Sequence, residues 1–242
     1  RQHEYPFFVK QKKHCIDEGT QFNDYKDTYN DYIQYKEQNS AMRKAKKIIK
    51  DFNGDTHKTV LFLSYKAENW NTMDNIYKKY CQEKDIKVIV QCVPYYYKNI
   101  DGTFEKYIDG GMYPEYVTIT PIEDYNYVNE NPDVIVFQYP YDNYNSAGTT
   151  DPVFYSYNLA SHTQKLIYIP YFRTDEIDEN DMRAYTNMDA YVTMPGVVYA
   201  DKVIVQSEEI RKLYIKKLTD FFGEESEDEW EDKIEAEDIG GI

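Results

Sequence analysis

Tyrosine and proline occur together in loops that follow hydrophobic segments of this 242-residue chain. Three such loops are VPYYYKNIDGTF, YPYDNYNSAGTTDP and PYFRTDE, and a fourth, SYKAENWN, adds a lysine and a tryptophan. Tyrosine rings present flat apolar faces, and their hydroxyls donate and accept hydrogen bonds. A hydroxyl with a pKa near 10 is a poor base at neutral pH. These loops therefore predict a binding surface rather than a catalytic one.

The chain has 27 tyrosines, and this number could have either of two origins. Stacking surfaces for sugars or nucleotides would use the rings directly. The codon usage of an AT-rich genome would also raise tyrosine, together with Asn, Lys, Ile and Asp, which are abundant here too. The sequence leaves both origins open, and the abundance of those other residues favours codon usage.

Motifs of established catalytic chemistry are missing from the sequence. It contains no G-x-G-x-x-G, G-x-x-x-x-G-K-[ST] or G-x-S-x-G motif, and its four histidines are scattered. His162 precedes its hydrophobic segment, so it is expected at the edge of the sheet opposite the ligand. Asp175, Asp178 and Asp181 recur every third residue, but they lack the glycine and terminal glutamate of a calcium loop. We expect these aspartates at a helix start, and no metal site is predicted.

Short hydrophobic segments, separated by helical stretches, must position the tyrosine loops. Most are rich in Val and Ile and apolar on both faces, which is typical of parallel strands covered by helices on both sides. The sequence predicts an α/β fold with a doubly wound, mostly parallel Rossmann-like sheet, preceded by N-terminal helices. In such a sheet the ligand crevice lies beyond the carboxyl ends of the strands. The predicted strands cover residues 58–64, 86–92, 133–138, 165–170, 190–194 and 202–207.

Three parts are expected along the chain: a helical segment over 1–55, a Rossmann-like domain over 56–222, and an acidic linker or tail over 223–242. The formal net charge is −15, and ten acidic residues and one lysine lie between Glu224 and Asp238. Binding to nucleic acid needs clustered Lys and Arg, so no nucleic acid partner is expected.

Helix starts and stops can also be predicted from residue types. Apolar residues at helical spacing predict helices between about residues 22 and 52, with a break near Asn39 and a cap at Ser40. Gly54 is expected to stop the second of these helices. Ser207 is expected to cap the helix that follows the last predicted strand.

The cysteines and the lengths of the hydrophobic segments indicate the cellular compartment of the protein. Cys15, Cys81 and Cys92 form no close pair, which indicates a reducing compartment. The sequence has no run of eighteen apolar residues and no signal peptide, so a cytoplasmic protein is predicted. The basic segment AMRKAKKIIK at 41–50 could contact an anionic membrane at its inner face, or could be the solvated side of a helix. The first residue is Arg1 rather than Met, so the chain could be a fragment.

Several ordered motifs resemble those of one family. YKAENWNTMDNIY, VPYYYKNIDGTF, YPYDNYN, DPVFYSYNL, KLIYIPYF and ADKVIVQSEEIRKLYI are similar to the amino-terminal half of bacterial CDP-glycerol glycerophosphotransferase-like proteins, which are related to teichoic acid polymerases. The resemblance extends over about residues 59–222. It implies a glycosyltransferase-B architecture, in which an amino-terminal Rossmann-like half holds the acceptor and a carboxy-terminal half holds the CDP-activated donor.

Under this resemblance the chain is the acceptor half. Its partners would be the missing donor-binding half and an acceptor polymer or small polyol phosphate. No cofactor is expected in the chain itself, because CDP-glycerol is the donor substrate of the full-length protein. The polymerases carry a His-Gly pair at the end of one strand, whereas this sequence has Pro170 and Tyr171 there. The resemblance therefore implies that this half alone is inactive.

The predicted acceptor site gathers side chains from the loops after the strands. Lys66 could meet a phosphate or be a surface lysine, and Trp70 could stack on the acceptor or pack at a helix start. Asp142 is the only carboxylate in the set, and so the only alternative base. The predicted substrate-binding residues are Ser64, Lys66, Trp70, Tyr95, Tyr96, Tyr141, Asn145 and Tyr171.

Three functions remain open from the sequence. The full-length protein could transfer glycerol phosphate to a cell-surface polymer. Alternatively, the chain could be a non-catalytic module that recognises a polyol phosphate, a sugar or a protein partner through its tyrosines. It could also be an interaction scaffold that depends on its helical lead and acidic tail.

Overall fold

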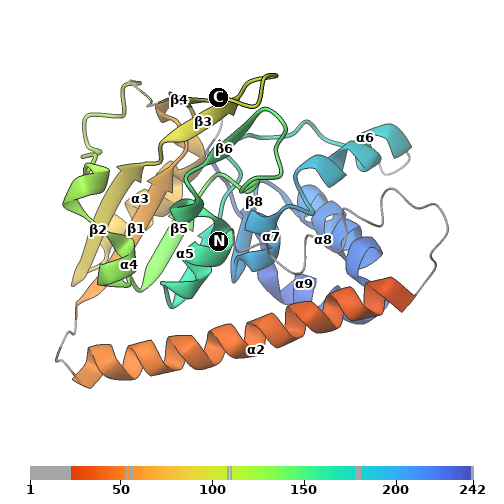
Figure 1. Cartoon of the computed structure of the whole chain (residues 1–242), viewed down its shortest axis with the longest axis horizontal. Helices are drawn as coiled ribbons and strands as arrows, with labels where there is room; N and C mark the ends of the chain where they lie inside the picture. Colours follow the sequence, from red (N-terminus) through yellow and green to blue (C-terminus); the bar gives the residue numbers. More distant parts are fainter. Residues whose placement is uncertain are drawn as a thin grey trace.

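The computed structural model describes residues 23–52, 54, 57–107, 109, 111–177 and 181–240. Six strands form one sheet in the order β2-β1-β5-β7-β8-β9, and every neighbouring pair is parallel (Figure 1). These strands are β1 (Lys58–Ser64), β2 (Ile86–Cys92), β5 (Val134–Phe137), β7 (Lys165–Tyr168), β8 (Lys202–Val205) and β9 (Ile234–Ala236). The predicted α/β fold with a parallel sheet is confirmed.

Successive residues of each strand enter two different hydrophobic cores. Leu61 and Leu63 of β1 belong to one core, whereas Val60 and Phe62 belong to the other. The first core is covered by α5 (Ser156–Ser161), α7 (Pro195–Tyr199) and α8 (Glu208–Phe222), and the second by α3 (Asn71–Gln82). This two-sided cover explains why the strands are apolar on both faces, and it confirms the doubly wound arrangement.

The order of the strands reverses at β1, which lies between β2 and β5. The carboxyl ends of β1 and β5 therefore flank the position where open parallel sheets bind ligands. A second, antiparallel sheet in the order β4-β3-β6 lies near this edge (Figure 1). It consists of β3 (Tyr95–Lys98), β4 (Phe104–Tyr107) and β6 (Gly148–Thr150). The sequence predicts loops for these residues, because the strands are short and mix tyrosine with polar residues.

Short helices and 3₁₀ turns complete the connections. Segment 190–194 was expected to be a strand, but this expectation is wrong. The backbone N–H of Val192 donates to the Met188 carbonyl at 2.8 Å. The segment therefore forms a turn that buries Val192, and Val192 does not pair with a strand. The short helices are α4 (Tyr127–Glu130) and α6 (Met182–Asn187), and the 3₁₀ turns are Ala67–Asn69, Ile122–Asp124, Pro152–Phe154, Met188–Ala190 and Glu224–Ser226.

Of the two expected helix caps, Ser207 is present, whereas the Ser40 cap is wrong because Ser40 lies inside a continuous helix, α2 (Asn23–Phe52). The Ser207 hydroxyl accepts a hydrogen bond from the Ile210 N–H and caps α8. The Asp181 carboxylate accepts from the backbone N–H groups of Arg183 and Ala184 and caps α6. The helix-start interpretation of Asp181 is therefore confirmed, while Asp178 lies outside the described residues.

Helix α2 (Asn23–Phe52) is continuous across the predicted break. The Asn39 side chain is buried beside Arg43, whose guanidinium donates to the Ala160 carbonyl at 3.0 Å and fixes the helix to α5. The predicted stop is confirmed, because Gly54 has a φ of +75° just beyond the last helical residue. The helix crosses the amino ends of the strands, along the lower side of the molecule in Figure 1. Residues 1–22 of the predicted helical segment lie outside the described residues.

The acidic end of the chain is folded, so the expected linker or tail is wrong for residues 224–240. Helix α9 (Glu227–Lys233) leads into β9, which extends the main sheet beside β8. Trp230 is fully buried, with its ring 5.3 Å from that of Tyr32 and 4.9 Å from that of Phe222. The acidic composition of this segment did not reveal its packing. The few apolar residues between the acids, such as Trp230 and Ile234, are the ones that are buried.

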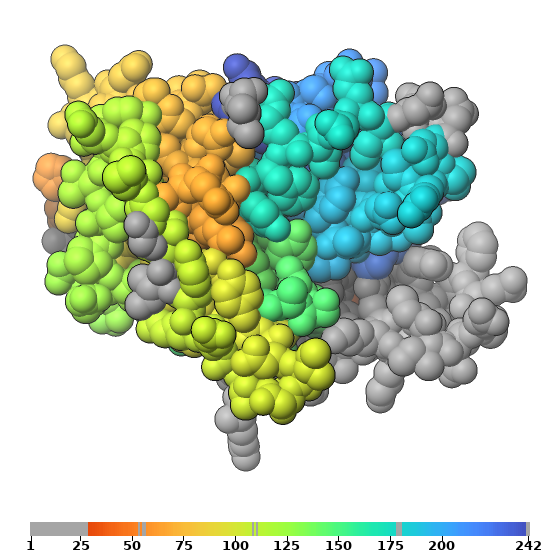
Figure 2. Space-filling view, turned by 90° about the horizontal axis from the view of Figure 1, so that it is seen from above, coloured from red at the N-terminus to blue at the C-terminus, as the bar shows by residue number. Residues whose placement is uncertain are grey.

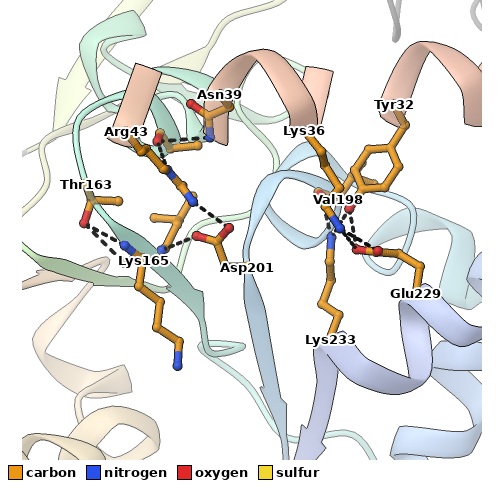
Figure 3. A network of polar contacts seen from close by, with 12 residues as sticks. Tyr32, Lys36, Asn39, Arg43, Thr163, Lys165, Val198, Asp201, Glu229 and Lys233 are labelled. Carbon is orange, nitrogen blue, oxygen red and sulfur yellow. Dashed lines mark hydrogen bonds and ion pairs between the residues drawn. The ribbon is translucent and has the colours of Figure 1, made fainter. Parts of the chain in front are cut away.

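Lys233 joins α9 to α2 and α7 from a buried position. Its amino group donates to the Tyr32 hydroxyl at 2.7 Å and to the Val198 carbonyl at 2.8 Å (Figure 3). The Glu229 carboxylate accepts from the Lys36 amino group at 2.6 Å and from the Tyr32 hydroxyl at 3.0 Å. Burial lowers the pKa of Lys233 to about 7, and the nearby Glu229 charge opposes this shift. The two ends of the described chain are thus bound to each other.

Replacing Trp230 with alanine tests this packing. The W230A variant should lose about 3–5 kcal/mol of unfolding free energy, because a buried ring would be replaced by a cavity. F104A is the matched control, since Phe104 is exposed on β4 and its loss should cost less than about 0.5 kcal/mol. Urea denaturation followed by circular dichroism measures both. Equal losses in the two variants would show that the acidic end does not pack on the sheet.

Candidate functional site

The polar groups at the carboxyl ends of β1 and β5 bond to one another. Gln138, which follows β5, accepts from the Tyr65 N–H at 2.9 Å through Oε1. Its amide nitrogen donates to the Asn69 carbonyl and to the Thr72 hydroxyl, both at 2.9 Å. Gln138 is fully buried, so it fixes the two strand exits against each other. We did not predict this role, although a glutamine at the end of an apolar strand was a signal for it.

Five tyrosines from four segments of the chain pack together at this edge and form what we call the tyrosine cluster. They are Tyr65, Tyr95, Tyr139, Tyr141 and Tyr171. The Tyr65 ring is central, and its centroid lies 4.9 Å from those of Tyr95 and Tyr171 and 5.1 Å from that of Tyr139. Tyr65 and Tyr139 were not among the predicted site residues. Figure 2 views this edge and shows the segments after β1 (orange), of the β3–β4 hairpin (yellow) and after β7 (teal) together.

The hydroxyls of Tyr141 and Tyr171 lie 3.4 Å apart, and both side chains are half-buried. Burial raises the pKa of the Tyr141 hydroxyl well above its usual value, and the hydrogen bond with Tyr171 raises it further. Burial likewise raises the pKa of Tyr65. The Tyr65 and Tyr141 hydroxyls therefore stay neutral at physiological pH, so they can donate and accept hydrogen bonds but are not bases.

Lys66 places a positive charge beside the tyrosine cluster. Its amino group lies 5.4 Å from the centre of the Tyr65 ring and 5.3 Å from that of Tyr95, within the range of cation–π attraction. The exposed Glu68 carboxylate is 3.5 Å away. An anionic ligand on the cluster would compete with Glu68 for this lysine.

Three of the predicted substrate-binding residues belong to the core. Ser64, Trp70 and Tyr95 are almost completely buried. Trp70 packs against Phe62 at 6.3 Å between ring centroids, and its indole N–H donates to Asp74 at 3.2 Å. Trp70 therefore packs at the start of a helix, as the second interpretation of this residue predicted. These three side chains support the loops from below rather than line a surface.

Two further predicted residues lie in or beside the small sheet. Tyr96 is half-buried in β3 and pairs with Thr149 of β6. Asn145 shapes the loop after β5, because its side-chain oxygen accepts from the Ala147 N–H at 2.8 Å. The Asn145 carbonyl also accepts from the Lys98 amino group at 2.7 Å. Both contacts stabilise the loop that contains Asn145.

Asp142 is enclosed by the fold. Its side chain is 1 % exposed, and its two oxygens accept from the backbone N–H and the hydroxyl of Ser156, each at 2.9 Å. Burial raises the pKa of Asp142 to about 7, against the lowering effect of the two hydrogen bonds. This carboxylate holds the start of α5 and does not point out toward a ligand on the tyrosine cluster.

The loop after β5 is held closely by α7. The Gly196 N–H donates to the Pro140 carbonyl at 2.8 Å. A Cβ at Gly196 would lie only 2.4 Å from the Pro140 Cα, so no other residue fits there without displacing the loop. The proline-tyrosine segment is therefore rigid at its first turn.

His162 lies away from the tyrosine cluster. It ends α5 at the amino edge of the sheet, as expected, and burial lowers its pKa. Among the described residues, no group of three or more His, Cys, Asp or Glu side chains could hold a metal ion. None of the described helices is long and apolar enough to cross a membrane.

The tyrosine cluster leaves almost no space between its rings. A cavity of about 10 Å³ lies below Tyr65 and Tyr139, which is at most the room of one water molecule. A ligand therefore has to lie over the cluster and not within it. This cavity is far smaller than the roughly 300–1,000 Å³ of sites that enclose a small ligand.

The fold and this edge define an α/β protein with a Rossmann-like sheet and an aromatic, hydroxyl-bearing surface at the carboxyl ends of its strands. In comparisons with known proteins, no family model, no curated protein and no solved structure matches the chain. The family resemblance of the loop motifs remains a prediction.

The buried Asp142 gives a measurable dependence of stability on pH. Its pKa is higher in the folded than in the unfolded protein, so the folded state holds the proton more tightly between about pH 4 and 7. The contribution of this carboxyl to the unfolding free energy therefore falls as pH rises through that window. The parent protein should lose unfolding free energy between pH 5 and pH 8, and D142N should reduce this loss by roughly 1–4 kcal/mol.

Urea denaturation at the two pH values measures this difference. E123Q is the control, because it removes a carboxylate that is exposed in the structure. An unchanged pH dependence in D142N would mean that Asp142 is not buried as described.

Proposed function

We propose that this chain is the acceptor-binding, Rossmann-like half of a CDP-glycerol glycerophosphotransferase-like protein. The full-length protein would transfer glycerol phosphate to a hydroxyl of a cell-surface polymer. The observation that carries the proposal is the convergence of Tyr65, Tyr141, Tyr171 and Lys66 at the carboxyl edge of a parallel sheet. The loops that supply these side chains are the ones whose sequences resemble the family.

The surface suits a polymer of polyol phosphates. The hydroxyls of Tyr141 and Tyr171 can bond to polyol hydroxyls in either direction, and Lys66 can meet a phosphate. The small size of the cavity below the cluster favours an acceptor that lies over the rings, because enclosed small-molecule sites are usually cavities of roughly 300–1,000 Å³. Tyr141 and Tyr171 are therefore proposed as the main contacts, with Ser64, Trp70 and Tyr95 supporting them.

The transfer step would be carried out by a second domain. Among the described residues of this edge, Asp142 is enclosed, and the Tyr65 and Tyr141 hydroxyls keep their protons at neutral pH, so none of the three can act as the base. CDP-glycerol would bind to the donor half, and positioning and charge neutralisation would carry most of the catalysis. A cytoplasmic location, where the activated donor would be made, belongs to the same proposal.

A non-catalytic binding module is the second candidate. Pro170 and Tyr171 stand at the strand end where the polymerases carry His-Gly, and this favours recognition without turnover. The same tyrosines would then hold a polyol phosphate, a sugar or a protein partner.

Titration calorimetry with glycerol phosphate oligomers tests the acceptor surface. The chain should bind the oligomers, and Y141F should weaken the affinity by roughly two- to tenfold, because one hydrogen bond is lost. Y141A should weaken it further through loss of ring contact. Y157A is the matched control, since Tyr157 is a partly exposed tyrosine packed near α2. Tight binding of CDP-glycerol to this chain would contradict the assignment of roles.

The product of the complete gene distinguishes the enzyme from the binding module. With CDP-glycerol and an oligomer acceptor, an enzyme releases CMP while the oligomer grows. We expect this turnover, together with a higher KM for the acceptor and a nearly unchanged kcat in Y141F. Oligomer binding without CMP release would favour the binding module.

A further inference from the structure

A pocket of about 380 Å³ lies at the amino edge of the sheet, where α2, the end of α7 and α9 meet. Its volume falls within the roughly 300–1,000 Å³ that is usual for sites of small ligands. Among the described residues, four basic side chains and two acidic ones line it, although the chain as a whole has a net charge of −15. The charged residues are Lys36, Arg43, Lys44, Lys233, Asp201 and Glu229.

Both acids of the pocket are paired with cations from α2. The Asp201 carboxylate accepts from the Arg43 guanidinium at 2.7 Å, and the Glu229 carboxylate accepts from the Lys36 amino group at 2.6 Å. Figure 3 shows these two pairs apart from each other, the first on the left and the second on the right. The other two cations of the pocket, Lys44 and Lys233, have no carboxylate among their described contacts.

Lys233 is the buried cation of the pocket, with only 4 % of its surface exposed. Its amino group uses two of its three N–H donors, toward the Tyr32 hydroxyl and the Val198 carbonyl, and neither acceptor carries a charge. Burial lowers the pKa of Lys233 to about 7, the Glu229 charge opposes this shift, and the Lys36 charge adds to it. A negatively charged ligand in the pocket would supply the counter-ion that this buried amino group lacks.

Tyrosine rings and aliphatic side chains form another part of the wall. The ring centroid of Tyr35 lies 4.7 Å from that of Tyr199, and Val198 and Ala200 line the pocket beside them. Burial raises the pKa values of the Tyr32, Tyr35 and Tyr199 hydroxyls, so none of them adds a negative charge near neutral pH. A ligand that fills the pocket therefore meets both positive charge and apolar surface.

The five basic residues of segment 41–50 differ in their contacts. Arg43, Lys46 and Lys50 are bound to groups of α5 and of the amino edge of the sheet, whereas Lys44 and Lys47 are exposed. The sequence-based expectation had assigned all five to a membrane or to solvent. Lys44 lines the pocket and Lys47 does not, although both are lysines of one helix about one turn apart. Lys44 is therefore free to meet a ligand in the pocket, and Lys47 serves as its control.

We propose that this pocket binds a small phosphorylated molecule. Lys233 and Lys44 hold its doubly charged phosphate, and the remainder of the molecule lies against Tyr35 and Tyr199. Phosphate oxygens accept the third N–H of Lys233, and two negative charges match the two cations without a described carboxylate partner. A monocarboxylate would leave one of these cations unbalanced. This inference does not rest on the proposed function, because the pocket lies at the edge of the sheet opposite the tyrosine cluster.

Titration calorimetry with sulfate tests the charge of the site. Sulfate keeps both negative charges between pH 6 and pH 8, so a change in its affinity comes from the protein. The dianion favours the charged form of Lys233, so the Kd for sulfate should rise by up to about tenfold over this range. At pH 8 binding should take up about one proton, because Lys233 is mostly neutral before the ligand enters. Buffers of different ionisation enthalpy measure this uptake.

Phenyl phosphate tests the apolar wall. At pH 8 it carries the same two charges as sulfate, and its ring adds apolar contact with the tyrosines. It should therefore bind more tightly than sulfate, because apolar surface leaves water. Sulfate bound as tightly as phenyl phosphate would describe a site for a bare ion and would overturn the proposal.

Two lysines of α2 provide the matched variants. K44A should raise the Kd for both ligands by about three- to tenfold, because one charged hydrogen bond to the ligand is lost. K47A makes the same change of charge outside the pocket and should bind as the parent does. Equal weakening by K44A and K47A would reveal only a general effect of net charge and would contradict the site.

The buried lysine is tested by K233M, which keeps an unbranched side chain and removes the amino group. This variant should lose the pH dependence of the sulfate affinity between pH 6 and pH 8, an effect that a purely structural role of Lys233 would not produce. A pH dependence retained in K233M would overturn the proposal, and so would failure of the parent to bind either ligand. If K233M does not fold in circular dichroism, the proton uptake of the parent at pH 8 decides, and its absence overturns the proposal.

Discussion

The structure depends on the parallel pairing of β1 with β2 on one side and with β5 on the other. This pairing sends the loops after the strands to one edge, and the tyrosine cluster could not form without it. Tyr65, Tyr95, Tyr139 and Tyr171 are far apart in the sequence, and their rings meet only because the strands below them are in register. Gln138 then fixes the two central exits by bonding to the backbone of both Tyr65 and Asn69.

The amino edge of the sheet is held by charge and by aromatic packing. Asp133 and Asp201 bind the basic side of α2, and Glu229 binds its first half through Lys36. The acidic excess of the chain is therefore partly used within the fold, where it fixes a long helix to the ends of the strands. Surface ion pairs contribute little singly. Here they act along one helix together with the packing of the buried Trp230.

The two edges of the sheet differ in chemistry because different forces formed them. At the carboxyl edge, burial keeps tyrosine hydroxyls neutral, and the rings exclude water from the space between them. At the amino edge, lysines and aspartates fix α2 so that its apolar side faces outward. The first surface suits uncharged hydroxyls and a phosphate near Lys66, and the second exposes an apolar side of α2.

The sequence by itself determined the strands with two apolar faces, their common direction and the Ser207 cap, because these depend on local residue patterns. It predicted the bounds of β1 and β2 as the structure has them, and it placed Lys66, Tyr141 and Tyr171 in loops at one edge. It could not show that Ser64, Trp70, Tyr95 and Asp142 are buried, since their exposure depends on which loops fold over them. The continuity of α2 at Asn39 and the packing of Trp230 were also decided by tertiary structure. In both cases the contact joins residues more than a hundred positions apart, Arg43 with Ala160 and Tyr32 with Trp230, where no local pattern can reveal it.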